Sequence, residues 1–446
     1  MINMITRKPR VKGAVGNLDI CIIGAGYVGL TSAAVLAELG HHVRCLDTDS
    51  EKIKALTSGE VPFFEPGLKE MIQRNHARLS FSVPEAGILN QYPVVFIAVG
   101  TPSAPSGQAD LTYVRSVIDF IAGELTTRKT IITKSTVPPG TNEWICRTLK
   151  NKGVDPQLFD VISNPEFLRE GSAISDTVHP DKIVVGKREE DHRSLPVIEA
   201  IYQKIDAPYV VTSLTGAELI KYTSNAFLAA KISFINEIAR ICDAFEVNIE
   251  DVARGIRTDP RIGPHFLQAG IGYGGSCFPK DVRSLVYNAG LKNVDPVLLR
   301  AVQSVNHSQI DVYLDKLRSA LPDLSGKKVT VLGIAFKPNT DDTRYSPGVA
   351  LIQKLSELGC TVSAYDPEAK LPGPPVPHVS QVSEIKTAVE KADAVVIATD
   401  WEEFIDLDWA EIKAKMNGDL ILDARNCIEP DTIRKKGLRY LGVARP

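Results

Sequence analysis

The amino-acid sequence predicts an α/β fold in which two doubly wound parallel sheets are joined by a long central helix. Three observations lead to this prediction. An apolar strand over residues 18–23 runs directly into a glycine-rich turn and a helical pattern. Residues 215–247 have the apolar spacing of one long helix. The last third of the chain repeats the strand–helix–strand order of the first, as expected for two Rossmann-like domains.

Length and composition restrict the class of protein. The chain has 446 residues, 44% of them hydrophobic, so it can bury cores in several domains. Its net charge is −3 with both signs mixed, which argues against a nucleic-acid-binding protein because such proteins carry a basic stripe. No apolar run approaches the roughly 18 residues of a membrane span. Seven cysteines without metal-ligand spacing favour a reducing compartment, so we expect a cytoplasmic enzyme without a metal.

The glycine-rich turn Gly24-Ala-Gly26-Tyr-Val-Gly29 has the spacing of a dinucleotide-binding turn. Gly24 permits the tight turn, Gly26 lets a pyrophosphate approach the backbone, and Gly29 lets the helix pack on the strand. The next predicted strand, residues 43–46, ends at Asp47, which can accept hydrogen bonds from ribose hydroxyls and would repel a 2′-phosphate. The turn therefore predicts NAD rather than NADP, and a turn without a ligand is the alternative.

Two further predicted strands, residues 93–99 and 130–134, lead into loops that contain Thr101 and Thr136. Ligands of an open parallel sheet bind beyond the carboxyl ends of its strands. Both loops are therefore expected to border the cofactor. For the prolines of these loops, ordinary turn chemistry is the better interpretation.

Two carboxylates follow the next predicted strand, residues 159–162. If a helical turn starts after Pro165, Glu166 and Glu170 lie four residues apart on one face. Beside a cofactor they could supply a general base and a cofactor contact. The equal alternative is an exposed, acid-rich helix start favoured by the helix dipole.

Lys221 and Asn225 lie four residues apart on the predicted long helix and share one of its faces. Such a pair could hydrogen-bond an oxygen that gains negative charge in a transition state. Taken from the residues alone, a solvated pair on the helix exterior is the commoner arrangement, so both interpretations stay open.

The strongest catalytic signal is the glycine-rich segment from Gly270 to Asp281, which contains Cys277. Its glycines allow the backbone to pass close to a ligand, and Pro279 suits the first turn of a helix that would begin near the thiol. The helix dipole and Lys280 should lower the pKa of the thiol and favour a nucleophilic thiolate, while Asp281 could hold a water or accept a proton. We expect packing roles for three other cysteines, Cys21, Cys45 and Cys242.

The second repeat differs from the first in its turn. The strand that ends at Gly333 is not followed by the GxGxxG spacing, and the loop carries Lys337 and Arg344, whose cations suit oxyanions. This difference predicts a second nucleotide, such as a nucleotide sugar, in place of the dinucleotide.

The chain resembles the UDP-glucose/GDP-mannose dehydrogenase family over about residues 19–427. The resemblance rests on segments that occur in order: GAGYVGL, VGTPS, KSTVPPGT, SNPEFLREG, ELIKYTSNAFLAAKISFINE, RIGPHFLQAGIGYGGSCFPKD and GIAFKPNTDDTR. It implies an N-terminal extension over residues 1–17, expected to be disordered, and an NAD-binding Rossmann-like domain over 18–213. A helical dimerisation region with the cysteine loop over 214–315 and a UDP-sugar-binding Rossmann-like domain over 316–446 complete the chain.

The resemblance also implies an activity. Within the family the sequence is most similar to the branch that oxidises C6 of UDP-glucose to UDP-glucuronate, with two NAD per turnover and a cysteine thiohemiacetal and thioester as intermediates. The expected partners are this nucleotide sugar and a second copy of the chain, with no nucleic acid and no membrane. The same reaction on GDP-mannose or a UDP-N-acetylhexosamine, and a two-electron hydroxyacid dehydrogenase, are the alternatives.

Site residues are carried over by motif. The resemblance implies a nucleophile, two oxyanion-stabilising residues, two water-positioning residues and a base for hydrolysis, in the order Cys277, Lys221, Asn225, Asp281, Thr136 and Glu166. The implied cofactor contacts are Gly24, Gly26, Tyr27, Val28, Gly29, Asp47, Lys52, Thr101, Thr136, Glu170, Lys280 and Arg344. The implied substrate contacts are Glu166, Phe167, Leu168, Arg169, Glu170, Lys221, Asn225, Arg261 (from a neighbouring subunit), Phe266, Leu267, Gln268, Ala269, Gly270, Gly274 and Lys337.

Overall fold

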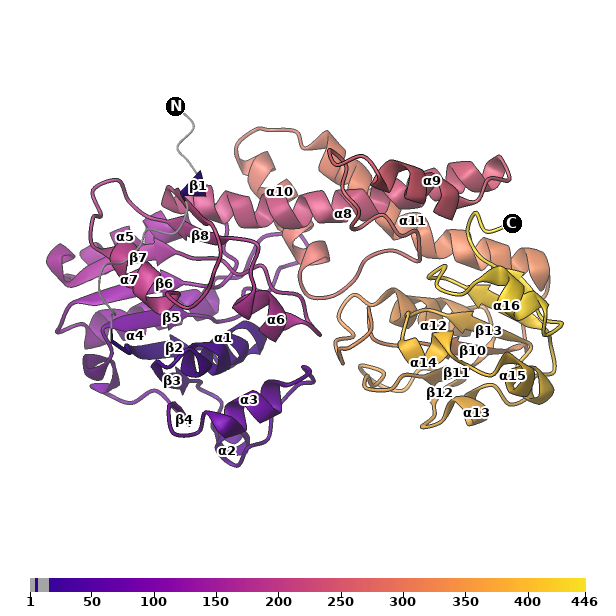
Figure 1. Cartoon of the computed structure of the whole chain (residues 1–446), viewed down its shortest axis with the longest axis horizontal. Helices are drawn as coiled ribbons and strands as arrows, with labels where there is room; N and C mark the ends of the chain where they lie inside the picture. The colour runs from indigo at the N-terminus through magenta and orange to yellow at the C-terminus, as the bar shows by residue number, and fades with distance from the viewer. Residues whose placement is uncertain (1–4, 7–15) are drawn as a thin grey trace. The chain divides into compact units, whose positions relative to one another are not determined.

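A computed structural model describes residues 5–6 and 16–446 of the chain (Figure 1). The chain forms two compact units, Met1–Ser224 and Asn225–Pro446, and the boundary falls inside the long helix α8 (Leu214–Ala244). Most of the extension expected to be disordered, residues 1–4 and 7–15, lies outside the described residues, whereas Ile5–Thr6 forms strand β1. Within the described residues, no helix has the length and apolar character needed to cross a membrane.

Strands and helices alternate through most of the first unit. Its strands are β1, β2 (Asp19–Ile23), β3 (His42–Leu46), β4 (Leu79–Ser82), β5 (Val94–Ile97), β6 (Lys129–Thr133), β7 (Phe159–Ser163), β8 (Ile183–Gly186) and β9 (Tyr209–Thr212). Its helices are α1 (Tyr27–Glu38), α2 (Ser50–Thr57), α3 (Leu68–Arg74), α4 (Thr112–Glu124), α5 (Thr141–Asn151), α6 (Ala173–Val178) and α7 (Ser194–Ile201), with 3₁₀ turns η1 (Ile88–Gln91) and η2 (Pro156–Leu158).

The first sheet has the strand order β1-β9-β8-β7-β6-β5-β2-β3-β4 over the described residues. The strands from β4 to β7 are parallel, whereas β8 is antiparallel to β7 and β1 is antiparallel to β9. Alternate residues of β2 enter the cores on the two faces, Ile20 on one and Cys21 on the other, as a sheet covered on both sides requires. The loops after β2, β3, β5, β6 and β7 therefore emerge at one edge of the sheet, and the strand order reverses between β2 and β5.

The second unit contains the rest of α8 and a second sheet. Its helices are α9 (Ile249–Arg257), α10 (Phe278–Leu291), α11 (Val297–Ala320), α12 (Pro347–Glu357), α13 (Ile385–Ala388), α14 (Glu402–Ile405), α15 (Trp409–Lys415) and α16 (Pro430–Arg434). Its strands are β10 (Lys328–Leu332), β11 (Thr361–Tyr365), β12 (Val379–Gln381), β13 (Ala394–Ile397), β14 (Leu420–Asp423) and β15 (Arg439–Leu441). The all-parallel order β12-β11-β10-β13-β14-β15 matches that of β4 to β7, so the predicted repeat is confirmed.

The same kind of close contact, between a helix and the turn after the strand that precedes it, occurs separately in each unit. A Cβ placed on Gly29 in α1 would lie 1.8 Å from the carbonyl oxygen of Gly24, which has a φ of +110°. In the second unit a Cβ on Gly348 in α12 would lie 2.5 Å from the carbonyl oxygen of Gly333, with a φ of +112°. The GxGxxG spacing is absent there because a longer loop separates the strand from its helix, but the packing is the same.

Replacing Gly29 with alanine should lower the free energy of unfolding by about 1–3 kcal/mol, because the new methyl group overlaps the Gly24 carbonyl and the backbone must move. Gly26→Ala is the matched control, since a Cβ on Gly26 would meet no atom within 4 Å. Urea unfolding of both variants measures the difference. Equal stability of the two variants would contradict the assigned packing role of Gly29.

Candidate active site

The turn between β2 and α1 is shaped for a phosphate. Gly26 is the N-cap of α1 with an extended φ of −82°, and Tyr27, Val28 and Gly29 form the first turn of the helix. Open space lies where a Cβ of Gly26 would stand. The backbone amides of a helix N-terminus therefore face a gap that a pyrophosphate can enter. These residues fit the dinucleotide that the sequence predicts.

Asp47 lies at the end of β3, next to this turn. One carboxylate oxygen accepts hydrogen bonds from the amide of Ala25 at 2.9 Å and from Lys52 Nζ at 3.0 Å, and the other accepts from the amide of Asp49. Burial alone would raise the pKa of Asp47, but these hydrogen bonds and the Lys52 ammonium hold it below its ordinary value. The side chain is thus an ionised acceptor fixed beside the turn.

The loops after β5 and β6 are joined by a hydrogen bond in which Thr101 Oγ1 donates to the carbonyl of Thr136 at 2.6 Å. The rest of the second loop is held by Glu218 of α8, which accepts from the amide of Gly140 and from the backbone and side chain of Asn142. Glu218 is buried, and burial raises its pKa to about 7. The sequence analysis missed this carboxylate, although its place three residues before Lys221 puts it near the same face of the helix.

The helical turn predicted after Pro165 is wrong. Residues 164–169 are irregular, and α6 begins only at Ala173. One oxygen of Glu166 instead accepts from the amide of Leu168 at 2.8 Å and the other pairs with Lys221 Nζ at 2.8 Å. These two contacts fix the Glu166 carboxylate in a segment without regular secondary structure.

Glu166 and Lys221 are both buried, so neither is the exposed side chain of the alternative interpretation. The ring of Phe167 lies next to them, with Lys221 Nζ 5.3 Å and Lys182 Nζ 4.2 Å from its centroid. Ammonium groups over an aromatic face are attracted by the ring quadrupole. The loop after β7 therefore presents a carboxylate and an aromatic ring to two cations.

The remainder of this loop is tied to the glycine-rich turn. Glu65 accepts from the hydroxyl of Tyr27, from the amide of Gly171 at 2.6 Å and from the amide of Ala173 at 2.8 Å. Arg169 pairs with Asp176 at 2.6 Å, and Glu170 is buried. Glu65 was not among the sequence predictions, because no local pattern shows that it meets residues a hundred positions away.

In the second unit, Asn225 and Asp281 meet directly. Asn225 Nδ2 donates to one oxygen of Asp281 at 2.6 Å, and Lys280 Nζ donates to the other at 2.5 Å. Asp281 is buried in α10 and Asn225 is buried on α8, which also carries Lys221 one turn earlier. The solvated alternative for Asn225 is therefore also excluded.

Cys277 is the N-cap of α10, with Pro279 in the first helical turn, as the sequence predicts. It is half-buried, and its Sγ lies 3.5 Å from the hydroxyl of Ser276. The packing cysteines differ: Cys21, Cys45 and Cys242 are all buried, and burial raises the pKa of Cys21 to about 12. Only Cys277 combines a helix N-terminus with partial exposure among these four thiols.

The segment from Phe266 to Gly270 is held against α8 and α11. The amide of Gly270 donates to Asn236 Oδ1, and Gln309 Nε2 donates to the carbonyl of Gly270, both at 2.8 Å. Within this segment Leu267 and Ala269 are buried, and Gln268 donates to the carbonyl of Arg425. Arg261 is exposed and pairs with Asp259 at 2.6 Å.

The glycines before Cys277 pack against protein atoms, whereas the sequence analysis expected them to make room for a ligand. A Cβ on Gly274 would lie 2.4 Å from the carbonyl oxygen of Tyr345, and one on Gly275 would meet the ring of Phe336. The amide of Gly275 also donates to the carbonyl of Arg344 at 2.8 Å. The cysteine loop is thus fixed by the loop that carries Lys337 and Arg344. The guanidinium of Arg344 pairs with Asp342.

The structure therefore groups the predicted catalytic residues by unit. In the first unit, Glu166 pairs with Lys221. Thr136 lies in the loop after β6, the strand next to β7 in the sheet. The second unit holds Asn225 with Asp281, and Cys277 at the start of the same helix α10. Helix α8 carries Lys221 and Asn225 on one face, four residues apart.

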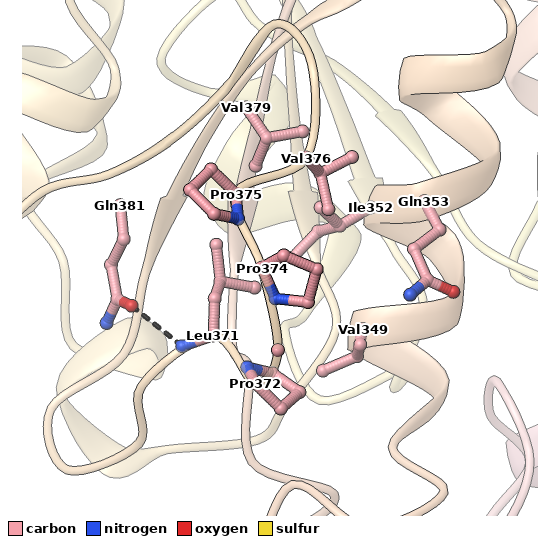
Figure 2. A pocket seen from close by; sticks show the side chains of 11 residues that line it. Val349, Ile352, Gln353, Leu371, Pro372, Pro374, Pro375, Val376, Val379 and Gln381 are labelled. Carbon is pink, nitrogen blue, oxygen red and sulfur yellow. Dashed lines mark hydrogen bonds between the residues drawn. The ribbon is translucent and has the colours of Figure 1, made fainter.

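A separate hollow in the second unit has a different character. It lies between α12 and the proline-rich loop before β12 (Figure 2), where the amide of Leu371 donates to Gln381 Oε1 at 2.8 Å. The described residues that line it are mainly valine, isoleucine, leucine and proline, with no titratable side chain. It offers no group for proton transfer or nucleophilic attack.

Three family models match the chain in order. The NAD-binding domain of the UDP-glucose/GDP-mannose dehydrogenase family matches residues 18–206, its central domain residues 215–308, and its UDP-binding domain residues 330–430. The chain belongs to this family. As a UDP-glucose/GDP-mannose dehydrogenase it is an enzyme with NAD as its cofactor, and most of its second sheet lies in the UDP-binding domain.

Individual members of the family are similar over nearly their whole length. A putative UDP-glucose 6-dehydrogenase of Bacillus subtilis is 53% identical, over 96% of this chain and 100% of the relative. Among solved structures, a UDP-glucose dehydrogenase of Pyrobaculum islandicum has a TM-score of 0.88 at 37% identity, over 98% of this chain and 99% of that one. A UDP-D-ManNAc dehydrogenase of Pyrococcus horikoshii has a TM-score of 0.85 at 30% identity, over 96% and 99%.

Proposed function

We propose that this dehydrogenase oxidises the C6 primary alcohol of UDP-glucose to the carboxylate of UDP-glucuronate, a four-electron reaction. The observation that carries the proposal is the half-buried thiol of Cys277 at the start of α10, in a chain 53% identical to a putative UDP-glucose 6-dehydrogenase. A two-electron hydroxyacid dehydrogenase would give this thiol no role. The cysteine therefore favours a reaction that passes through a covalent intermediate.

The cofactor is held by the turn and loops at the edge of the first sheet. Gly26 leaves space for the pyrophosphate, and Asp47 and Lys52 lie where the ribose is expected. One bound NAD would accept the hydride of the alcohol, and after its NADH leaves a second NAD would accept the hydride of the thiohemiacetal. Further contacts with NAD are proposed for Thr101, Thr136, Glu170, Lys280 and Arg344.

Proton removal from the alcohol is assigned to a water held by Asp281 or Lys221. Cys277 then adds to the aldehyde carbon, because the amides at the start of α10 favour its thiolate. The oxyanion of the resulting thiohemiacetal accepts hydrogen bonds from Lys221 and Asn225. The covalent bond keeps the aldehyde in the site and gives a species that can lose a second hydride.

Hydrolysis of the thioester completes the reaction. Asp281 and Thr136 are assigned to position the attacking water, and Glu166 is assigned as the base. The Glu166 carboxylate takes the proton of the attacking water, and its contact with Lys221 Nζ at 2.8 Å holds it in place for this step. Substrate binding is assigned to the loop after β7, to the backbone from Phe266 to Gly270, to Gly274 and Lys337, and to Arg261 of a neighbouring subunit.

The proposal includes a preference for UDP-glucose over other sugar nucleotides. UDP-glucose is expected to give the highest kcat/KM in a panel with UDP-galactose, UDP-N-acetylglucosamine and GDP-mannose, with NADH absorbance as the measurement. The UDP-D-ManNAc dehydrogenase of Pyrococcus horikoshii has a similar fold. A UDP-N-acetylhexosamine is therefore the main alternative substrate. A higher kcat/KM for any other sugar of the panel would overturn the assignment to UDP-glucose.

We also propose a homodimer formed through α8. Large apolar side chains on this helix are exposed at a seven-residue repeat, Phe227, Phe234 and Ile241, with exposed fractions of 64%, 51% and 49%. Leu219, earlier on the helix, and Phe245, directly after its last residue, are exposed as well. A seven-residue apolar repeat on one helix is complementary to the same stripe on a second copy. The predicted dimerisation region, residues 214–315, contains all of it.

Phe234→Asp should convert the dimer to a monomer, because the new carboxylate would be desolvated in the contact. Light scattering coupled to size-exclusion chromatography gives the mass. Tyr113→Asp, at a side chain 58% exposed on α4, is the matched control and should leave the dimer intact. A monomeric wild-type chain, or a dimeric Phe234→Asp variant, would contradict this interface.

The cytoplasm is the proposed location. None of the seven cysteines forms a disulfide. A reducing compartment would also protect the thiol of Cys277 from oxidation, which would remove the proposed nucleophile.

A further inference from the structure

A buried lysine, Lys134, directly follows β6 in the loop that carries Thr136. Its Nζ donates to Asn164 Oδ1 at 3.1 Å and to the hydroxyl of Tyr202 at 3.2 Å. Both partners are uncharged, and the residue is only 9% exposed. Burying an ammonium without a carboxylate partner raises the free energy of the folded state. A lysine kept in such a place at the edge of the sheet therefore suggests a function.

The partners of Lys134 fix the start of the loop that contains Glu166. Asn164 follows β7 and lies two residues before Glu166; its Nδ2 donates to the carbonyl of Val184 at 2.7 Å. The hydroxyl of Tyr202 donates to Asn164 Oδ1 at 2.8 Å. The Asn164 side chain is therefore held from three directions, by β6, β8 and the end of α7.

The charged and titratable groups that face Lys134 come from each neighbouring element. They are Tyr202 after α7, Glu166 after β7, and Lys221 on α8. Burial lowers the pKa of Lys134 to about 8; the charge of Glu166 opposes this shift and that of Lys221 adds to it. The Glu166–Lys221 pair thus has a second ammonium within Coulombic range.

We infer that Lys134 is a positioning residue of the reaction: its hydrogen bonds fix the loop that carries Glu166, and its positive charge favours the ionised carboxylate of Glu166, the proposed proton acceptor. This inference rests on the proposed function. A nearby positive charge makes a neighbouring group lose its proton more easily. Lys134 therefore helps to keep Glu166 ready to accept a proton below about pH 8, and ceases to do so as Lys134 itself is deprotonated.

Lys134→Met should move the acid limb of the kcat–pH profile to higher pH by on the order of one unit, because a like charge has been removed from the proton-transfer groups. Initial rates of NADH formation from UDP-glucose between pH 6 and 10 give the profile. kcat at pH 7 should fall while the KM for NAD stays nearly constant. A profile that coincides with that of the wild-type chain would overturn the inference.

Lys129→Met is the matched control. Lys129 is a buried lysine at the opposite end of the same strand, with Thr127 Oγ1 as its partner at 2.8 Å. Loss of its charge should leave the acid limb in place. An equal shift in the Lys129 variant would show that the effect is a general one of buried charge, and would also overturn the inference.

Tyr202→Phe provides a second variant if Lys134→Met fails to fold. It removes one hydrogen bond from the Lys134 ammonium and leaves the ring in place, so the pKa of Lys134 should fall further. In the wild-type chain, kcat should change near pH 8 as Lys134 loses its proton. In the Tyr202→Phe variant this change should occur at lower pH. No movement of this change in the Tyr202 variant would contradict the role of Lys134.

A measurement without turnover separates this inference from the proposed function. Between about pH 8 and 10.5 the unfolded chain holds a proton that the folded Lys134 has lost, so stability should rise with pH across this window. Lys134→Met should lack this rise in urea unfolding. If the wild-type chain oxidised no sugar nucleotide, the proposed function would fail while this difference would still establish the buried ammonium; a parallel pH dependence of both proteins would refute it.

Discussion

The ion pair between Lys221 and Glu166 connects the long helix α8 to the carboxyl edge of the first sheet. The two groups lie 2.8 Å apart and are both buried. Burying two charges is unfavourable unless further hydrogen bonds satisfy them, and removal of one partner typically costs about 3–5 kcal/mol. Here the amide of Leu168 satisfies Glu166, and the ring of Phe167 faces Lys221. The pair holds Lys221 of α8 against the loop after β7 within the first unit.

Glu218 adds a second connection between α8 and the same edge, through Gly140 and Asn142. The loops of Thr136 and Glu166 are therefore both held by side chains of one helix within a single turn. In the second unit, Asn225 of the same helix holds Asp281 of α10, the helix that begins at Cys277. Within each unit, a side chain on the hydrogen-bonded helix α8 thus holds a functional group in place more firmly than a flexible loop could.

Much of this arrangement could be predicted from local patterns. Strand β2, the turn at Gly24 and helix α1 are encoded within a short stretch, and Pro279 marks the start of α10. The exceptions depend on contacts between distant residues. Pro165 suggests a helix start, but the segment after it is irregular and Glu166 pairs with Lys221 of a distant helix. Lys134, Glu65 and Glu218 could not be found, because their partners are set by the order of strands in the sheet and not by spacing along the chain.

The central claim is that Cys277 forms a covalent intermediate in a four-electron oxidation. The most direct measurement is the amount of NADH formed per UDP-glucose consumed, for the wild-type chain and for Cys277→Ala. The account predicts two NADH per sugar for the wild-type chain, and a loss of UDP-glucuronate formation by several orders of magnitude in the variant. One NADH per sugar in the wild-type chain, or near-normal formation of the acid by Cys277→Ala, would contradict it.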